Sequence, residues 1–320
     1  MTTKDELLPP TAARPTTVLF VGGMPRSGST LLDLMVGQLP GHCDIGELFY
    51  MWQAGALRNQ QCACGQVFTG CPFWQAVGEE AFGGWDRVDV PAFLELQRSV
   101  DSTARLPLAL LGRLLPGHAA RVRSYLATTS ALYAAIARVS GAEVVVDSTK
   151  RPSTAYLLRR APGVDLHVVL VVRDPRGVVN SWSREVPLPA NAGAHAHLKR
   201  RPLRQIVRRW VTVNLMTEAL AGRVPLLRVR YEDLVRGPVP VMHQVLALTG
   251  AEPDAAATSF LGPAGLTTGK SHAVAGGRIR MKTGPLELRL DEAWRRELPP
   301  WKRAVTGLVA GPLMRRYGYR

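Results

Sequence analysis

The sequence predicts an α/β fold of three layers, in which helices flank both faces of a central parallel sheet. The prediction depends on four stretches whose apolar part is continuous and rich in β-branched residues, as strands buried on both faces are. They cover residues 18–21, 143–150, 166–172 and 224–229. Polar residues and then a helical pattern follow these stretches, as is typical of parallel strands joined through helices. We therefore expect the polar residues to meet at one edge of the sheet.

The first strand runs into a short glycine-containing loop and then a helix. Gly22, Gly23 and Gly28 permit backbone angles and close approaches that side chains would block. The apolar residues of segment 31–35 then have the spacing of a buried helix face. Backbone N–H groups at such a helix start favour an anion, so residues 17–32 predict a phosphate-binding loop.

This loop departs from the usual triphosphate-binding loop at one position. Gly23 and Gly28 match the G-x-x-x-x-G pattern, but Ser29 stands where a lysine normally follows. That lysine reaches the β- and γ-phosphates, so ordinary ATP hydrolysis or kinase chemistry loses its main cation. Arg26, inside the loop, supplies a cation instead. The strand–loop–helix context disfavours the alternative of a merely structural glycine turn.

The length of the chain allows one large α/β domain or two small ones. The chain has 320 residues, of which 46% are hydrophobic, enough for a packed core. We expect a loose leader over residues 1–16 and a single domain over 17–320. No run of 18 apolar residues is present, so a membrane span is not expected. The first residues lack a signal-peptide pattern, which favours a cytoplasmic protein. A homodimer is compatible with the sequence.

The formal net charge of +15 suggests attraction of anions. It fits either nucleic-acid binding or an arginine-rich surface with one local anion site. The sequence contains no nucleic-acid-binding module and no basic stripe interleaved with aromatic residues. We therefore favour a local anion site and expect no nucleic-acid partner.

Four cysteines, Cys43, Cys62, Cys64 and Cys71, lie within thirty residues. They could hold a zinc ion if Cys43 or a histidine such as His42 joined the other three, or they could form one disulfide. Free thiols are the default in the cytosol, and the C-x-C spacing is tighter than in a usual zinc knuckle. We assign no metal to the active site.

Helical patterns occupy much of the remaining chain. They cover residues 106–138, with a break at Pro116-Gly117, and then 205–220 and 287–316. In the first of these, the apolar stripe Leu108, Leu111 and Leu115 is expected to pack in the core. Residues 53–100 indicate irregular structure with short helices.

Two segments are expected to cover the carboxyl edge of the sheet. A cap is expected over about residues 47–118, and a basic segment rich in proline at 184–205 favours a substrate lid. The tail 262–285 is rich in glycine, lysine and arginine. It is expected to be a loop that either folds over an anion or forms a disordered connection.

Polar residues near the strand ends are the candidate functional residues. Asp147, Ser148 and Lys150 end the second strand. Glu47 leaves a turn after the first helix and is followed by bulky apolar residues, which makes it a candidate general base. A surface or salt-bridged glutamate is the plainer interpretation of Glu47 on the residues alone.

The end of the third strand offers a second anion site. Arg173 ends this strand, and Asp174 and Pro175 are good signals for the start of a helix. Ser181 follows within that helix. Arg173 and Ser181 could therefore converge on an anion.

Taken together, these motifs resemble the sulfotransferases that use 3′-phosphoadenosine 5′-phosphosulfate (PAPS). Segment 25–31 looks like their 5′-phosphosulfate loop, and 172–177 with Ser181 is similar to their 3′-phosphate site. Segment 230–234 matches a third motif near the nucleotide, and the order holds from about residue 17 to 284. The resemblance implies a P-loop NTPase-like fold, sulfotransferase activity and PAPS as donor, with adenosine 3′,5′-bisphosphate as product.

The likeness is closest to bacterial and tyrosylprotein-type members, in which a Gly-Glu pair follows the first helix. It implies that Glu47 is the general base and that Lys150 and Arg26 lie beside the transferring group. The histidine of the cytosolic small-molecule enzymes has no counterpart, because residues 147–150 occupy its position. Besides Arg26, the donor-binding residues that the resemblance implies are Ser27, Gly28, Ser29, Thr30, Leu31, Arg173, Ser181, Tyr231 and, in the tail, Arg278, Arg280 or Lys282.

Two other functions stay open. A P-loop small-molecule kinase predicts ATP turnover with Mg²⁺, and the missing loop lysine argues against it. A non-catalytic nucleotide-binding protein has only the basic charge in its support. For a sulfotransferase, the aromatic residues of 49–52 and 73–85 suggest an apolar or mixed acceptor pocket. The expected acceptor is the hydroxyl of a small molecule, carbohydrate or lipid, and a peptide tyrosine is less favoured.

Overall fold

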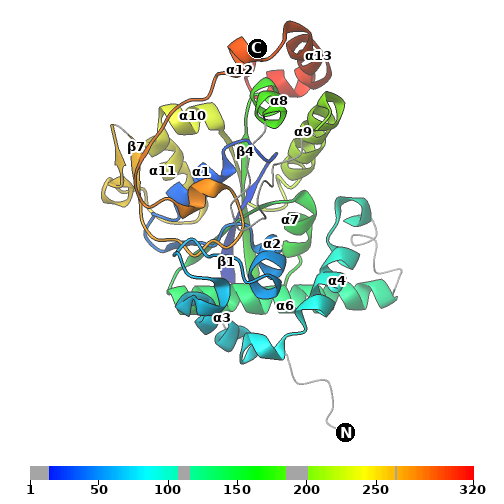
Figure 1. Ribbon diagram of the computed structural model, residues 1–320, viewed down its shortest axis with the longest axis vertical. Helices are drawn as coiled ribbons and strands as arrows, with labels where there is room; N and C mark the ends of the chain where they lie inside the picture. Colours follow the sequence, from blue (N-terminus) through cyan, green and yellow to red (C-terminus); the bar gives the residue numbers. More distant parts are fainter. Residues whose placement is uncertain (1–13, 107–115, 185–200, 264) are drawn as a thin grey trace.

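The computed structural model describes residues 14–106, 116–184, 201–263 and 265–320. Its centre is a five-stranded sheet in the order β2-β3-β1-β4-β5, and each neighbouring pair is parallel. Helices flank both faces of this sheet (Figure 1), so the predicted three-layer α/β fold is confirmed. The strands are β1 (Thr16–Gly22), β2 (His42–Asp44), β3 (Val144–Lys150), β4 (Val164–Val172) and β5 (Leu226–Arg230).

The central position of β1 decides where the strand ends meet. In the parallel register, Phe20 of β1 lies opposite Asp147 of β3 and Val168 of β4. The chain segments that leave these strands therefore emerge at the same carboxyl edge, as expected for an open parallel sheet. A short strand that was not among the four predicted, β2, pairs with β3 from His42 to Asp44.

One helical layer consists of α1 (Ser29–Val36), α10 (Tyr231–Arg236) and α11 (Pro238–Leu248). Leu19 and Val21 of β1 point into this layer and join one apolar core with it. Alternate residues of a strand face opposite sides of the sheet, so a continuous apolar strand can supply two cores at once.

The opposite layer contains α6 (Pro116–Ser140) and α7 (Pro152–Leu158). Val18 and Phe20 of β1 pack against these helices in a second core. The predicted break at Pro116 is the first residue of α6, because proline at the first helical position loses no backbone hydrogen bond.

The chain closes with a third packed group of helices. It contains α8 (Pro175–Ser183), α9 (Leu203–Glu218), α12 (Trp294–Glu297) and α13 (Pro300–Arg316). Trp210 of α9 is fully buried in the apolar core that these helices share with β4. The helices predicted over 205–220 and 287–316 are therefore present.

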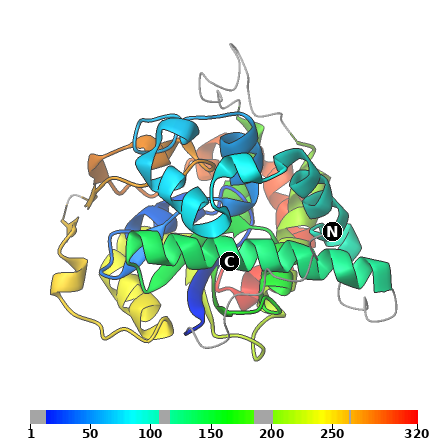
Figure 2. The same cartoon turned by 90° about the horizontal axis from the view of Figure 1, so that it is seen from below.

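The prediction of irregular structure with short helices over 53–100 agrees with the structure, in which two helices alternate with loops and short 3-10 turns. The two helices are α3 (Pro72–Phe82) and α4 (Val90–Val100), which pack along α6 on the underside of the molecule (Figure 2). Both helices have clear caps. Gly83 ends α3 in a left-handed conformation, and Asp89 accepts a hydrogen bond from Ala92 N at the start of α4.

Most cap aromatics pack in or against the apolar core. The helix α2 (Leu48–Met51) continues into a π-helical turn (Trp52–Leu57). The ring centroid of Trp52 lies 4.0 Å from that of Phe93 and 5.7 Å from that of Trp85. These three side chains therefore pack together and give no indication of the acceptor.

The tail after α11 is more regular than a loop, which corrects the sequence interpretation. It forms a small antiparallel sheet of β6 (Leu261–Gly262), β7 (Gly265–Thr268) and β8 (Gly284–Glu287), with a 3-10 turn at Arg278–Met281. Strands of two to four residues are too short to leave a period in the sequence. Figure 1 shows the tail running from this sheet across the carboxyl edge to α12.

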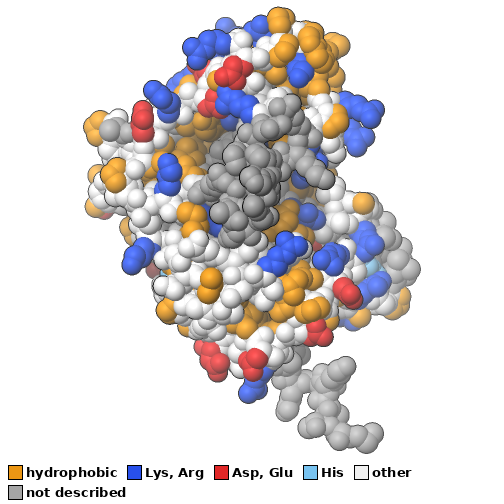
Figure 3. Space-filling model, viewed as in Figure 1, with side chains coloured by type: hydrophobic (Ala, Val, Ile, Leu, Met, Phe, Trp, Pro, Cys, Tyr) orange, Lys and Arg blue, Asp and Glu red, His pale blue; other side chains and the backbone are white. Residues whose placement is uncertain are grey.

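Some expectations concern residues outside the described part of the chain. They include the stripe Leu108, Leu111 and Leu115, most of the lid 184–205 and most of the leader 1–16. On the face seen in Figure 3, lysine and arginine side chains are spread among acidic ones. Among the described residues, no helix combines the length and apolar character needed to cross a bilayer.

Candidate active site

The loop between β1 and α1 is shaped by two glycines that no other residue can replace without a clash. Gly23 has φ 128°, and a Cβ there would lie 2.3 Å from the carbonyl oxygen of Val171. Gly28 has φ 92°, and a Cβ there would lie 2.5 Å from Tyr231 Cδ2. Gly28 O then accepts the first helical hydrogen bond, from Leu31 N at 3.0 Å. The loop thus wraps tightly around the start of α1.

Backbone strain also concentrates at this edge. Among the described non-glycine residues, positive φ occurs at Arg26 (78°), Lys150 (65°) and Asn59 (49°). Left-handed angles cost free energy for residues with a Cβ and persist where the surrounding structure enforces them, often at functional sites. Arg26 and Lys150 are candidate site residues. Arg26 lies in the loop after β1, and Lys150 is the last residue of the neighbouring strand β3.

The loop offers polar groups suited to an anion. Ser27 Oγ is buried and makes no hydrogen bond within the described part of the chain. Ser29 is buried and Thr30 half-buried in the first turn of α1, which contains no acidic residue. The free N–H groups of such a turn and its positive dipole end attract negative charge. The half-buried Arg26 adds a cation, although burial lowers the pKa of its guanidinium.

Glu47 and Lys150 form a buried ion pair at the same edge. Lys150 Nζ donates to Glu47 Oε1 at 2.7 Å, and the two side chains are only 8% and 15% exposed. Lys150 Nζ also donates to the carbonyl oxygen of Ser148 at 2.7 Å. The residues are 103 positions apart in the chain, so the sheet brings a base and a cation together beside the phosphate-binding loop.

Asp147 holds this pair in place and lies too deep for chemistry. Its carboxylate accepts hydrogen bonds from Leu48 N at 3.2 Å, from Tyr133 Oη at 2.6 Å and from Thr149 Oγ1 at 2.6 Å. Burial raises the pKa of Asp147. Because Leu48 begins α2 directly after Glu47, these contacts fix the direction in which Glu47 points. Asp147 is thus a positioning residue.

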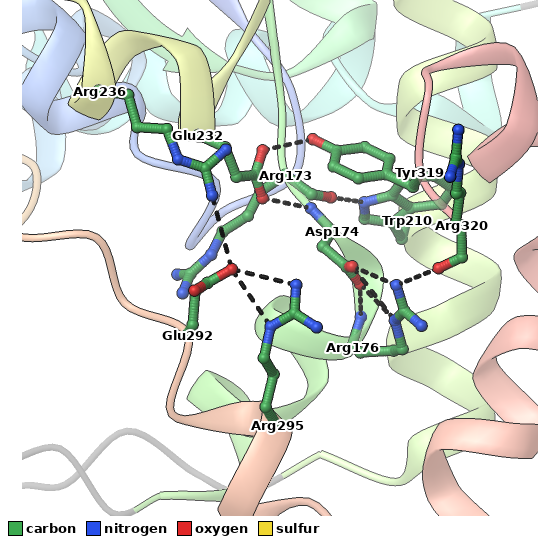
Figure 4. A network of polar contacts seen from close by, with 10 residues as sticks. All are labelled: Arg173, Asp174, Arg176, Trp210, Glu232, Arg236, Glu292, Arg295, Tyr319 and Arg320. Carbon is green, nitrogen blue, oxygen red and sulfur yellow. Dashed lines mark hydrogen bonds and ion pairs between the residues drawn. The ribbon is translucent and has the colours of Figure 1, made fainter.

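Arg173 lies between the phosphate-binding loop and the tail. Its guanidinium donates to the carbonyl oxygen of Arg26 at 3.1 Å and to that of Asp291 at 2.8 Å. Its own carbonyl oxygen accepts a hydrogen bond from Trp210 Nε1 at 3.0 Å, as Figure 4 shows. The end of β4 is therefore held rigidly against the loop after β1.

Tyr231 completes the contact between these strand ends. Its ring packs on Gly28, and the guanidinium of Arg173 lies 4.5 Å from the ring centroid. Its hydroxyl accepts a hydrogen bond from Asp291 N at 3.3 Å. The structure thus brings Arg26, Gly28, Arg173 and Tyr231 together, as expected.

Ser181 is half-buried in α8, eight residues beyond Arg173. The next residue, Trp182, donates from Nε1 to the carbonyl oxygen of Pro25 at 3.4 Å. This contact places that end of α8 beside the phosphate-binding loop.

Comparison with known proteins agrees with this architecture. The model of the sulfotransferase family matches residues 19–255, which is more than half of the chain. The chain belongs to the sulfotransferase family. Among solved structures, the sulfotransferase domain of the olefin synthase from Synechococcus PCC 7002 is 21% identical, with a TM-score of 0.55 over 97% of this chain and 98% of that chain. No curated protein matches the sequence.

A second solved structure has the same fold. The sulfotransferase domain of the curacin biosynthetic pathway is 18% identical, with a TM-score of 0.53 over 96% of this chain and 99% of that chain. The family match confirms the predicted sulfotransferase resemblance, and the parallel sheet confirms the predicted fold class.

The tail of this sulfotransferase covers the carboxyl edge. A Cβ on Gly277 would lie 3.0 Å from Thr30 Oγ1, and one on Gly276 would lie 3.5 Å from Glu47 Oε1. Glu47 N donates to the carbonyl oxygen of Ala275 at 3.2 Å. The tail backbone therefore forms one wall of the site.

The three basic tail residues have different surroundings. The buried Arg280 donates to the carbonyl oxygens of Val274 at 3.0 Å and of Ala273 and Gly276 at 3.3 Å. Lys282 is exposed, and the side chain of Arg278 lies outside the described part of the structure. Arg280 thus stabilises the conformation of the tail through hydrogen bonds to its backbone.

Sequence reasoning missed Asp291. Its carboxylate lies 3.0 Å from Arg173 Nη2. Partial burial opposes ionisation, but the hydrogen bond and charge of Arg173 lower the pKa of Asp291 overall. No local motif surrounds this aspartate, so only the fold could bring it to attention.

Proposed function

We propose that this sulfotransferase moves the sulfuryl group of PAPS to an acceptor hydroxyl, with Glu47 as general base. The observation that carries the proposal is the contact between two anion-binding elements, in which Arg173 donates to the carbonyl oxygen of Arg26. A single phosphate-binding loop suits many nucleotides. Two adjoining sites suit a nucleotide with phosphates on both its 5′ and 3′ positions.

The residues at this edge fit such a donor. The loop N–H groups and the hydroxyls of Ser27, Ser29 and Thr30 would hold the 5′-phosphosulfate. Ser27 Oγ has no hydrogen-bond partner among the described residues, so it is suited to donate to a phosphate oxygen. Arg173 and Ser181 would hold the 3′-phosphate. Bound PAPS supplies an activated sulfuryl group on a phosphate leaving group. In the tail, Arg278, Arg280 or Lys282 would supply a further contact to the 3′-phosphate.

The buried ion pair supplies the acid–base part of the reaction. Sulfuryl transfer resembles phosphoryl transfer, in which positioning and electrostatic stabilisation do most of the catalysis. Glu47 Oε1 is held by Lys150, so Oε2 is the oxygen that takes the proton of the acceptor hydroxyl. The Lys150 ammonium and the Arg26 guanidinium stabilise the negative charge that develops on the oxygens nearby.

The acceptor approaches from the side of α2. Phe49 and Tyr50 follow Glu47 directly and are half-buried, and the guanidinium of Arg151 lies 4.1 Å from the Phe49 ring centroid. This mixed aromatic and basic surface supports the hydroxyl of a small molecule, carbohydrate or lipid as acceptor.

Calorimetry tests the donor against the alternatives of a kinase and of a nucleotide-binding protein. We expect adenosine 3′,5′-bisphosphate to bind at least tenfold more tightly than ADP, and Arg173→Ala to remove this preference. Tighter binding of ADP would instead favour the kinase. If the bisphosphate binds but labelled PAPS is not transferred to any of a panel of phenols, sugars and lipid alcohols, the protein is a nucleotide-binding protein without transferase activity.

A further inference from the structure

Three cysteines and one histidine from distant parts of the chain converge outside the active site. Cys62, Cys64 and Cys71 come from the segment between α2 and α3, and His272 comes from the tail. Their three sulfurs and the histidine ring nitrogen all lie within 4.8 Å of one another. Among the described residues, this is the cluster of cysteine, histidine and acidic side chains suited to a metal ion.

Four of the six distances between the ligand atoms are close to the edges of a tetrahedron, and the other two are at most 4.8 Å. Cys71 Sγ lies 3.5 Å from Cys64 Sγ, 3.8 Å from Cys62 Sγ and 3.3 Å from His272 Nδ1. Cys62 Sγ lies 3.7 Å from His272 Nδ1. A zinc ion bound at ~2.3 Å by sulfur and ~2.05 Å by nitrogen requires edges of about 3.8 Å between sulfurs and about 3.5 Å between sulfur and nitrogen.

The backbone presents the ligands in a preformed arrangement. Cys62 N donates to Gln66 O at 2.8 Å, and Gly65 N donates to Cys62 O at 3.0 Å, so the segment turns tightly around the first two thiols. Cys71 stands directly before α3. Cys62 and Cys71 are buried, so solvent is largely excluded from the centre of the cluster.

The histidine is held in place by groups behind it. Its ring stacks on Phe73 with centroids 4.4 Å apart and an angle of 15° between planes. Trp74 Nε1 donates to its carbonyl oxygen at 2.8 Å. Such supporting contacts orient the ligands of metal sites.

We propose that Cys62, Cys64, Cys71 and His272 bind one Zn²⁺ ion in a closed structural site. Three thiols release their protons to solvent as thiolate–zinc bonds form, and Nδ1 of neutral His272 supplies the fourth bond, so no oxidant or reductant is needed. Four protein ligands leave no open position, which indicates a structural and not a catalytic ion. The fourth ligand is His272, whereas the sequence suggested Cys43 or His42.

The ion would connect the cap to the tail that covers Glu47. Ala63 N, between two of the ligands, donates to Ala273 O at 2.9 Å, directly after His272. Two residues further on, Ala275 O accepts from Glu47 N. Arg280 bridges the same two segments, since its Nη2 donates to Gln61 O at 3.4 Å and to Val274 O at 3.0 Å. Zinc bound outside the active site would thus stabilise the position of tail residues 273–275, which lie beside Glu47.

Metal analysis of the full chain tests this proposal independently of any transferase activity. We expect one zinc per chain by mass spectrometry of protein purified from zinc-supplemented medium. Cys64→Ser and His272→Ala should lower the zinc content roughly tenfold or more. Cys43→Ser, which alters a thiol outside the cluster, is the matched control and should retain the zinc.

A second measurement uses wild-type protein, so it does not require any variant to fold. Protein refolded with Co²⁺ should show thiolate-to-cobalt charge-transfer bands and the strong visible absorption of tetrahedral cobalt. Wild type without zinc and without these bands would overturn the proposal, as would a Cys64–Cys71 disulfide in the purified protein. Equal loss of zinc from the Cys43→Ser control would overturn the ligand assignment.

Discussion

At the scale of single residues, the proposed chemistry depends on the Glu47 carboxylate. Glu47→Gln keeps the shape of the side chain and an oxygen for the hydrogen bond from Lys150, but removes the base. We expect kcat to fall by roughly 10²- to 10⁴-fold, the usual contribution of a positioned base. The affinity for adenosine 3′,5′-bisphosphate should change less than about twofold, since the nucleotide contacts remain.

Labelled-PAPS assays and calorimetry on the same samples check this prediction. Glu95→Gln, which alters an exposed carboxylate of α4, is the control and should keep wild-type turnover. Wild-type kcat in Glu47→Gln would exclude Glu47 as the base.

Individual residues also show where sequence reasoning reaches its limit. Glu47 and Lys150 could each be named from the sequence, but their 2.7 Å contact depends on how α2 meets β3. Asp291 escaped notice, because it becomes part of the site only through its contact with Arg173. Residue types indicate chemistry, whereas their pairing depends on the fold.

At the scale of elements, the β1–α1 loop must have a glycine at its last position. In Gly28→Ala, the new Cβ would meet Tyr231 and the residue would have to keep φ 92°. We expect the affinity for adenosine 3′,5′-bisphosphate to fall at least tenfold, because the ring and loop cannot both keep their places. Gly250→Ala is the matched control, since Gly250 has φ 80° with open space around it.

Both variants should lose about 1 kcal/mol of stability through backbone strain. Only Gly28→Ala should lose nucleotide affinity, as measured by calorimetry. Equal affinities in the two variants would show that the loop tolerates a side chain at Gly28.

The buried carboxylate of Glu232 connects the last residues of the chain to the end of β4. Glu232 of α10 accepts hydrogen bonds from Asp174 N at 3.2 Å and from Tyr319 Oη at 2.7 Å (Figure 4). Burial and the charge of Glu232 raise the pKa of Tyr319, so this hydroxyl stays a donor. Tyr319→Phe would leave one carboxylate oxygen buried without its donor.

We therefore expect Tyr319→Phe to lower the free energy of unfolding by about 1–3 kcal/mol, as measured by urea denaturation. Tyr156→Phe is the control, because its hydroxyl donates to the uncharged carbonyl oxygen of Met216 at 3.1 Å. Its loss should be smaller, about 0.5–1.5 kcal/mol. A larger loss in the control would contradict this account of the Glu232 network.

At the scale of the whole molecule, two buried carboxyl groups behind the phosphate-binding loop make stability depend on pH. Burial raises the pKa of Asp44 from 3.8 to about 6, although Ser271 Oγ donates to it at 2.6 Å. Burial and the charge of Asp44 raise the pKa of Asp33 as well. Between about pH 4 and pH 6 the folded chain therefore holds protons that the unfolded chain has lost, and stability falls as pH rises.

Asp44→Asn removes the ionisable group and should stabilise the protein above pH 6. We expect a gain on the order of 1–2 kcal/mol at pH 7.5 that shrinks toward zero near pH 4. Urea denaturation of both proteins at several pH values measures this difference, and a difference independent of pH would contradict the prediction.

The α/β class, four of the five central strands and the glycine-containing loop after β1 could be predicted from the sequence alone. These features are local: the continuous apolar run of β1 and the residues Gly23, Arg26 and Gly28 that follow it are close together in the sequence and can be recognised there. The same holds for the helix-start signals after β4, where Asp174 caps α8. Buried strands and caps follow from short-range physics that a single sequence carries.

Which distant residues meet depends on the folded structure. The small sheet β6–β8 and the pairing of Glu47 with Lys150 depend on packing across the chain. His272 lies 201 residues from Cys71, so no local spacing could reveal it as their common ligand. Contacts of this kind form when strand pairing and packing bring together residues far apart in the chain, and a local pattern does not indicate which distant residues will meet.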